Sequence, residues 1–236
     1  MSIFVLKIIA VITMLIDHLS FVIYGSTFSW MRYIGRISFP IYAFLIAEGY
    51  NHTKNVKQYL IRLLIFALIS QYPFDLFNSP RIDYIYLNIG FTLLLGLLSI
   101  IIYEKINAFI NKLCIDKIDK YILKIIPISI VIIISIISYL INSDYSFFGV
   151  ILIFIFHLFK NNKLLLNIFV VIWIITSYCP IYFNSKLLIK FIFYLIPFIL
   201  INFYNGEKGK SFKALFYLIY PVHLLILGIL EIILNI

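Results

Sequence analysis

Apolar residues dominate this chain from end to end, and they fall into nine runs separated by polar connectors. Most runs approach the length of about 20 residues that an α-helix needs to cross the hydrocarbon core of a bilayer. The pattern predicts an all-α integral membrane protein, a polytopic bundle of about nine transmembrane helices forming a single domain over residues 1–236. The predicted spans are residues 3–24, 32–50, 57–77, 86–103, 122–141, 147–160, 163–182, 186–203 and 212–234.

Composition favours the same fold class. Hydrophobic residues make up 64% of the 236 residues and charged residues only 12%, and the mean hydropathy is +1.08. A soluble domain is roughly half apolar and about a quarter charged. A water-soluble core does not account for this excess, whereas the lipid-facing surface of a membrane bundle does.

The longest connector is residues 104–124, in which apolar residues alternate with Lys and Asp at roughly helical spacing. Two interpretations remain open for it. The first is an amphipathic helix that lies on the inner leaflet of the membrane. The second is a solvated charged loop.

The net charge of +9 raises the question of nucleic-acid binding, but the distribution of the cations has a better explanation. Connectors on one predicted side carry twelve Lys residues, and the opposite side carries five Lys or Arg residues. Because cytoplasmic loops of membrane proteins collect Lys and Arg, we expect a cytoplasmic N-terminus, an extracytoplasmic C-terminus and no nucleic-acid partner. The twelve are Lys54, Lys57, Lys105, Lys112, Lys117, Lys120, Lys124, Lys160, Lys163, Lys208, Lys210 and Lys213, and the five are Arg32, Arg36, Arg81, Lys186 and Lys190.

Ionisable side chains inside the predicted spans are the first candidates for function. They are costly in a bilayer, and they usually face the bundle interior or a water-filled cavity. The candidates are Asp17, His18, Arg36, Glu48, Arg62, His157 and His223.

Several of these candidates also have a purely structural interpretation. Glu48 and Arg62 can form an ion pair between neighbouring helices. Arg36 can pair with Asp17 or Asp75, which would neutralise both charges without any chemistry. His157 lies near the inner end of its span, and we expect it to reach the headgroup region.

Lys7 and His18 share one face of the first predicted helix. They are eleven positions apart, which at 100° per residue is three full turns plus about 20°. The rise of 1.5 Å per residue separates them by about 16 Å along the axis. One face of this helix thus offers a cation near its cytoplasmic end and a base in the membrane interior. That arrangement suits a long anionic ligand whose reactive end enters the membrane, and it equally suits a proton path.

Several segments together resemble the TraX family. They are "LKIIAVITMLIDH", "GRISFPIYAFLIAEGYNHTKNVKQYLIRLLIFALISQYPFD", "FTLLLGLL", "DYSFFGV" and "YPVHLLIL". The resemblance implies a bacterial inner-membrane protein, because TraX proteins are found there. The best-known members acetylate the N-terminal amine of conjugative pilin, with acetyl-CoA as the donor. The family looks like a distant branch of the transmembrane acyltransferase superfamily, and Lys7 and His18 occupy the positions of that superfamily's Arg, ten residues, His pattern.

Acetyl transfer needs a base for the acceptor proton, and histidine titrates near working pH. We expect His18 to be that base. Asp17 points about 100° away around the helix, so we expect it to hold Arg36 or another helix's residue. His223 follows Pro221, which frees a backbone carbonyl, and it can face His18 across a cavity as acid, base or acetyl carrier.

Acetyl-CoA is the expected acetyl donor, and its phosphates call for cations. Candidate CoA-binding residues gather at the predicted cytoplasmic ends of the first three spans: Lys7, Glu48, His52, Lys57 and Arg62. No H-E-x-x-H motif or Cys/His cluster occurs in the sequence, so we predict no metal. The acceptor stays unidentified: a peptide or pilin amine and a glycan or lipid hydroxyl fit equally well.

Two other classes of function remain open. In a proton-coupled transporter or lipid exporter, the intramembrane Asp, His, Glu and Arg residues would form a proton relay. No inverted repeat is visible, because the charged residues crowd into the first three spans, and this disfavours repeat-built transporters. In a non-catalytic assembly factor, the polar cluster would be structural.

Overall fold

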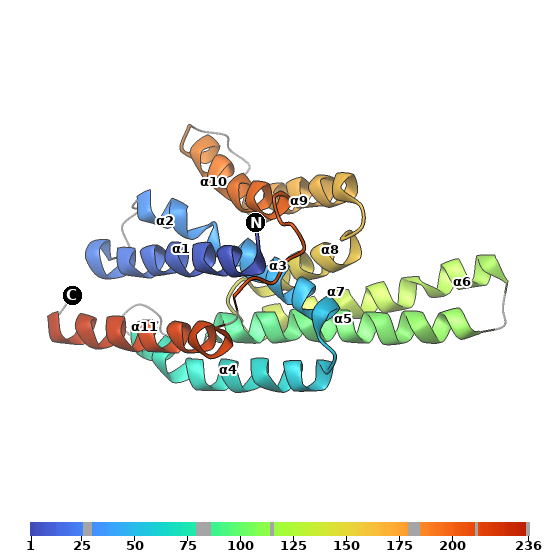
Figure 1. Cartoon of the computed structure of the whole chain (residues 1–236), viewed down its shortest axis with the longest axis horizontal. Coiled ribbons are helices and arrows are strands. Elements are labelled where there is room, and N and C mark those ends of the chain that lie inside the picture. The colour runs from blue at the N-terminus through green and yellow to red at the C-terminus, as the bar shows by residue number, and fades with distance from the viewer. Residues whose placement is uncertain (26–29, 79–85, 114–115, 179–184, 211, 235–236) are drawn as a thin grey trace.

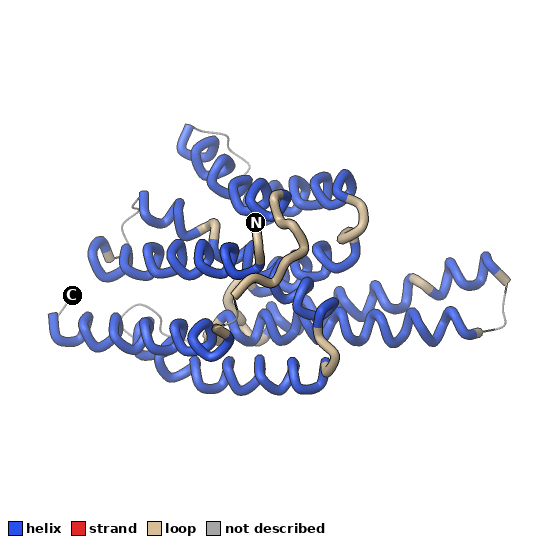
Figure 2. The backbone as a smooth tube through the Cα atoms, in the orientation of Figure 1, coloured by secondary structure: helices blue, strands red, loops and turns tan. Residues whose placement is uncertain are grey.

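A computed structural model describes residues 1–25, 30–78, 86–113, 116–178, 185–210 and 212–234. Secondary structure within these residues is almost entirely α-helical (Figures 1 and 2). The helices are α1 (Ile3–Tyr24), α2 (Trp30–Gly35), α3 (Ser38–His52), α4 (Val56–Asn78), α5 (Ile89–Lys112), α6 (Lys117–Leu123), α7 (Ile125–Leu140), α8 (Ser146–Leu158), α9 (Lys163–Tyr178), α10 (Ser185–Asn202) and α11 (Lys213–Leu234).

The predicted fold class is confirmed. Within the described ranges, four helices are long and apolar enough to cross a membrane: Ile3–Tyr24, Val56–Asn78, Ile89–Lys112 and Ala214–Leu234. The remaining five predicted spans correspond to the shorter helices α3, α7, α8, α9 and α10. Of the residues that were counted for orientation, Arg81 and the side chains of Lys117, Lys120, Lys186, Lys190 and Lys213 lie outside the described residues.

The 104–124 connector matches neither interpretation fully. α5 continues unbroken to Lys112, well beyond the predicted span end at residue 103, and α6 follows from Lys117. In Figure 1 the end of α5 and α6 extend the bundle lengthwise, side by side, to the right. The connector is therefore mostly helical, but it prolongs α5 and α7 and does not turn aside to lie across the bundle end.

The first and last long helices run side by side in the same direction (Figure 1). α11 packs mainly on α4, and α4 in turn packs on α5. α7 and α8 cover the other side of α5, while α9 and α10 lie beyond α8 and α3. This order brings the start and the end of the chain together, so α1 and α11 can build one site.

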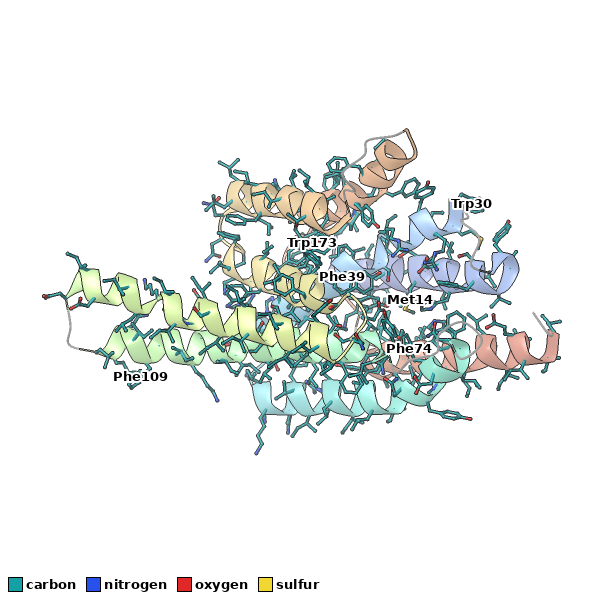
Figure 3. The ribbon with its side chains drawn as sticks, turned by 180° about the vertical axis from the view of Figure 1, so that it is seen from behind. Met14, Trp30, Phe39, Phe74, Phe109 and Trp173 are labelled. Carbon is teal, nitrogen blue, oxygen red and sulfur yellow. The ribbon has the colours of Figure 1, made fainter. Side chains whose placement is uncertain are left out.

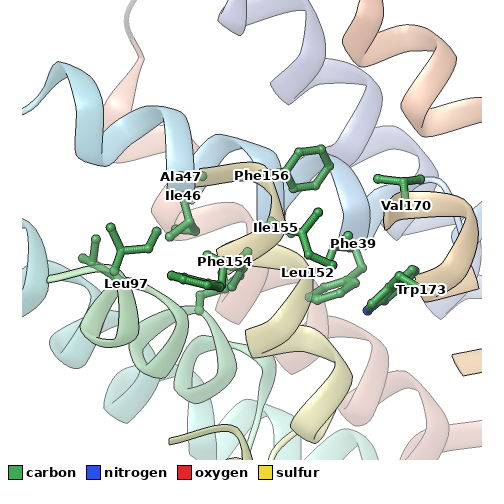
Figure 4. Packing of buried hydrophobic residues seen from close by; sticks show 14 of the residues in the cluster. Phe39, Ile46, Ala47, Leu97, Leu152, Phe154, Ile155, Phe156, Val170 and Trp173 are labelled. Carbon is green, nitrogen blue, oxygen red and sulfur yellow. The ribbon is translucent and has the colours of Figure 1, made fainter. Parts of the chain in front are cut away.

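The main core lies where α3, α5 and α8 meet. Phe39, Leu97, Leu152 and Ile153 are almost completely buried there, and Trp173 closes the cluster from α9 (Figure 4). By contrast, one face of α7 exposes a row of isoleucines, as expected for a surface in contact with lipid: Ile128, Ile132, Ile133, Ile136 and Ile137. Buried and lipid-facing residues are equally apolar, which explains why the hydropathy pattern alone locates spans but not faces.

Asn88 fixes the start of α5. Its side-chain oxygen accepts from the Gly90 N–H at 2.8 Å, and its amide nitrogen donates to the Ala67 carbonyl and to Gln71 Oε1, each at 2.8 Å. Leu87, one residue earlier, forms a parallel bridge with Ser143, in the loop between α7 and α8. Asn88 therefore joins α4 to α5, and Leu87 joins the start of α5 to that loop, at the end of the bundle that carries the candidate site.

We predict that Asn88→Ala lowers the free energy of unfolding by about 2 kcal/mol, because it removes a helix cap and the hydrogen bonds that the Asn88 amide donates to the Ala67 carbonyl and to Gln71. The thermal midpoint of the purified protein in detergent is the measurement. Asn88→Ser is the matched control, since serine keeps the cap but loses both amide donations, and it should fall in between. An unchanged midpoint for Asn88→Ala would contradict this account.

Candidate functional site

A cavity of about 500 Å³ lies inside the bundle, where α4 ends and α5 and α8 begin. Its lining residues come from eight helices and from the connectors that precede α3, α5 and α8. Figure 3 labels three of them, Met14, Phe39 and Phe74, which come from α1, α3 and α4. The ionisable residues in its lining, apart from the tyrosines, are Asp17, His18, Arg32, Arg36 and Asp144, and the aromatic ones are Phe21, Phe39, Tyr42, Phe66, Phe74, Phe77, Tyr86, Tyr145, Phe148, Phe216 and Tyr220.

Two imidazoles form the link between α1 and α11. His18 Nδ1 lies 2.6 Å from His223 Nε2, and the two ring planes are within 9° of parallel. His223 Nδ1 lies 2.7 Å from the carbonyl oxygen of Ile219, one turn earlier on α11. The pair is enclosed by the rings of Phe77 and Tyr220.

These contacts assign the protons of the two neutral rings. A carbonyl oxygen only accepts, so His223 Nδ1 carries a hydrogen and donates it to Ile219. His223 Nε2 is then the acceptor, and His18 Nδ1 must donate to it. His18 Nε2 is left with a lone pair. The main-chain carbonyl of α11 thus sets the tautomer of a side chain on α1.

His18 and His223 occupy different positions relative to the cavity. His18 is part of its lining, whereas His223 is 9% exposed and is not. The sequence allowed His223 to face His18 across a cavity; in the structure it contacts His18 directly and does not line the cavity. His223 is therefore placed to orient His18 and to exchange a proton with it.

Asp17 pairs with Arg32 of α2, so the alternative that it holds a residue of another helix is confirmed. Arg32 Nε lies 3.6 Å from Asp17 Oδ1, and the guanidinium of Arg32 sits 3.8 Å from the ring centre of Phe21. A Cβ atom on Gly35 would overlap the Asp17 side chain, so the glycine is what lets α2 approach α1 here. Of the two predicted partners of Arg36, Asp75 instead accepts from the Gln71 amide at 2.7 Å.

Arg36 lines the cavity and lies close enough to Asp17 and Asp144 to interact electrostatically with both. Asp144 belongs to the loop between α7 and α8. Burial raises the pKa of Asp144 to about 6, against the opposing effects of the Tyr145 backbone N–H and of Arg36. Tyr145 and Ser146 both have positive φ, 58° and 47°, which is a strained conformation for such residues and is typical of functional sites.

Lys7 meets the prediction that it shares a face with His18, since both side chains contact α11. Lys7 Nζ lies 5.3 Å from the ring centre of Phe216, which lines the cavity, but Lys7 itself does not line it. The other candidate cations also lie away from the cavity. His52, Lys57 and Arg62 are exposed residues of α3 and α4.

Glu48 and Arg62, for which an ion pair was one structural interpretation, have other contacts. Glu48 Oε1 lies 2.9 Å from His52 Nε2 and accepts from the Tyr204 hydroxyl at 2.9 Å. Arg62 instead lies 5.8 Å from the ring centre of Tyr59. Two residues of one turn of α3 satisfy each other more readily than side chains that project from different helices.

His157 does not reach toward headgroups as predicted. It is 3% exposed, and its Nε2 lies 2.6 Å from Glu104 Oε1 on α5. The rings of Tyr50 and Tyr103 pack edge-on against it. An acceptor on the neighbouring helix therefore holds this imidazole inside the bundle.

Sequence reasoning missed Arg32 and Asp144 as site residues. Arg32 was counted only as a cation of the outer side, although it stands four positions before Arg36 with Gly35 between them. Asp144 falls in the connector between the predicted spans 122–141 and 147–160, although its segment "DYSFFGV" carries part of the family resemblance. Partial signals for both residues were therefore present in the sequence.

Comparison with known proteins gives one family and one curated relative. The model of the family described as TraX protein matches residues 2–231. The probable fimbrial assembly protein FimC, serogroup H1, of Dichelobacter nodosus is 29% identical over 247 aligned positions, which cover 96% of this chain and 94% of the relative. No solved structure matches the chain.

We predict that the four histidines divide into two tautomer classes, which ¹⁵N spectra of histidine-labelled protein distinguish. His18 and His223 should carry their hydrogen on Nδ1. His52 and His157 serve as internal controls and should carry one on Nε2, because each places that nitrogen against a glutamate oxygen. A hydrogen on His18 Nε2 in the neutral ring would contradict the assignment.

Proposed function

This chain belongs to the TraX family, and on that basis we propose that it is an integral-membrane acetyltransferase. It moves an acetyl group from cytoplasmic acetyl-CoA to an amine or hydroxyl of an acceptor that is membrane-associated or extracytoplasmic. The relative's name, a probable fimbrial assembly protein, favours a pilin or another peptide amine over a glycan hydroxyl. The protein is a bacterial inner-membrane protein with its N-terminus in the cytoplasm and its C-terminus outside.

The observation that carries this proposal is the fixed tautomer of His18. A general base needs a lone pair directed at the reacting group and a second nitrogen that is held in place. His18 Nε2 has the lone pair, His18 lines the cavity, and its Nδ1 is held by His223. The arrangement does for this imidazole what an orienting acceptor does for the histidine of a catalytic triad.

The transfer itself exchanges one bond for another. The nitrogen or oxygen of the acceptor bonds to the acetyl carbonyl carbon, and the bond from that carbon to the CoA sulfur breaks. The acceptor proton moves to His18 Nε2, and the CoA thiolate takes it up on leaving. Arg36 supplies a cation to the oxygen that becomes negative in between, in an interior where such a charge is strongly stabilised.

The donor reaches the cavity from the opposite end of the bundle. We assign the phosphates of CoA to Lys7, His52, Lys57 and Arg62, with Glu48 holding His52 in position. Lys7 lies about 16 Å along α1 from His18. The reactive end of the donor then passes Phe216 to reach the base, while the charged end stays at the aqueous surface.

We predict that His18→Ala lowers the rate of acetyl transfer by roughly 10²-fold or more, since a positioned base contributes that much. The measurement is release of free CoA by purified protein supplied with acetyl-CoA and a peptide amine. Binding of acetyl-CoA should persist in His18→Ala, because the phosphate contacts are remote. Transport that is blocked by His18→Ala without any dependence on acetyl-CoA would instead support a transporter.

We predict a different result for His223→Gln. Glutamine can accept the His18 Nδ1–H but does not exchange protons with it, so the rate should fall less than in His18→Ala. The pH dependence of the acetyl-transfer rate should also shift in His223→Gln, because the imidazole pair no longer titrates as a unit. A loss equal to that of His18→Ala at every pH would mean that His223 itself reacts, for example as the acetyl carrier.

A further inference from the structure

We propose that Asp17 and Arg32 form a subsite for a zwitterion within the cavity. The acceptor presents an amino group to Asp17 and a carboxylate to Arg32, a few bonds away. This inference rests on the proposed function, because it names the class of acceptor that the same cavity takes.

The first observation is that the Asp17–Arg32 pair is incomplete. The two side chains meet only through Arg32 Nε and Asp17 Oδ1 at 3.6 Å, beyond hydrogen-bond distance. Asp17 Oδ1 and Arg32 Nη1 are both buried, and neither has a hydrogen-bond partner among the described residues. Buried polar atoms are nearly always satisfied. The wall of the cavity thus offers one hydrogen-bond acceptor, Asp17 Oδ1, and one donor, Arg32 Nη1, that a ligand can satisfy.

The second observation is that both groups are held in place. The guanidinium of Arg32 lies over the ring of Phe21 at 3.8 Å, so its plane is fixed by stacking. Asp17 is confined by Gly35, where no Cβ would fit. A guanidinium whose orientation is set in advance loses less freedom when it takes a carboxylate in its fork.

The third observation is the balance of charge. The charged groups of the cavity lining are two carboxylates, Asp17 and Asp144, and two guanidiniums, Arg32 and Arg36. A zwitterion adds no net charge to this set, whereas a pure cation or anion leaves an uncompensated charge in a low-dielectric interior. The single negative charge of a carboxylate balances the single positive charge of an ammonium, whereas a doubly charged phosphate leaves one negative charge unbalanced.

The position of the subsite also suits the reaction. Asp17 and His18 both line the cavity, so the acceptor nitrogen and the base share one space. The bound ammonium first gives one proton to the Asp17 carboxylate. The neutral amine then attacks the acetyl carbon, and its second proton moves to His18 Nε2. Phe74 and Phe77 provide apolar walls beside them for the carbon chain that joins the two charged groups.

Small amino acids test this inference without acetyl-CoA. The full chain in nanodiscs is mixed with glycine, β-alanine, 4-aminobutanoate or 5-aminopentanoate, and binding is followed by ligand-observed NMR. Each is compared with its primary amide and with its N-acetyl derivative. We expect one chain length to bind roughly tenfold better than both derivatives, since each loses a charge-assisted hydrogen bond.

Variants assign the two preferences to their residues. Arg32→Gln should reduce the preference for carboxylate over amide to about one and leave amide binding intact, with Arg32→Lys in between because it keeps the charge but loses the fork. Asp17→Asn should remove the preference for the free amine. Lys112→Gln, on the exposed far end of α5, is the control and should change neither ratio.

Three results would overturn the inference: no preference in the wild-type protein, a carboxylate preference that survives Arg32→Gln, or tighter binding of 2-aminoethylphosphonate than of any carboxylate. If Arg32→Gln does not fold, Phe21→Leu keeps the charge, loosens the guanidinium and should still lower the ratio. CoA release by the same wild-type preparation is scored separately. If the protein releases CoA but shows no preference for the zwitterion, only the subsite proposal is wrong. If it shows the preference but releases no CoA, only the acetyltransferase proposal is wrong.

Discussion

The hydrogen bond between His18 and His223 is the interaction on which the rest of the site depends. It joins the first long helix to the last across the interior of the bundle. Its direction is imposed from outside the pair, because the Ile219 carbonyl can only accept. A main-chain atom of α11 thereby decides which nitrogen of His18 faces the cavity, and α1, α4 and α11 must pack as they do to keep that order.

The polar residues of the bundle form two separate groups at its two ends. One group surrounds the cavity and mixes acids, arginines and the imidazole pair. The other consists of the Glu48–His52 contact within α3 and the Glu104–His157 contact between α5 and α8, with exposed cations nearby. Lys7 and Phe216 lie between them. This division fits a reaction whose two substrates arrive from different sides.

The hydropathy pattern located most of the nine spans to within a few residues, since a bilayer dictates both length and composition. It ended the fourth span at residue 103, whereas α5 continues to Lys112, and it merged α2 and α3 into the single span 32–50. Helical spacing correctly placed Lys7 and His18 on one face. It could not name the helix that this face meets, and so the direct contact with His223 was not foreseen. The ion-pair partners of the charged residues could not be named from the sequence for the same reason. Arg32 takes Asp17 because the short helix α2, which no span-length pattern predicts, brings it there past Gly35.

The most direct test of the central claim follows acetyl-CoA labelled in the acetyl group, with purified protein and no acceptor. Free CoA and protein-bound label are measured for the wild type and for His18→Ala. The account predicts that both proteins bind acetyl-CoA and that slow release of CoA, to water or to the protein itself, requires His18. A folded, monodisperse wild-type protein that neither binds acetyl-CoA nor releases CoA would contradict it.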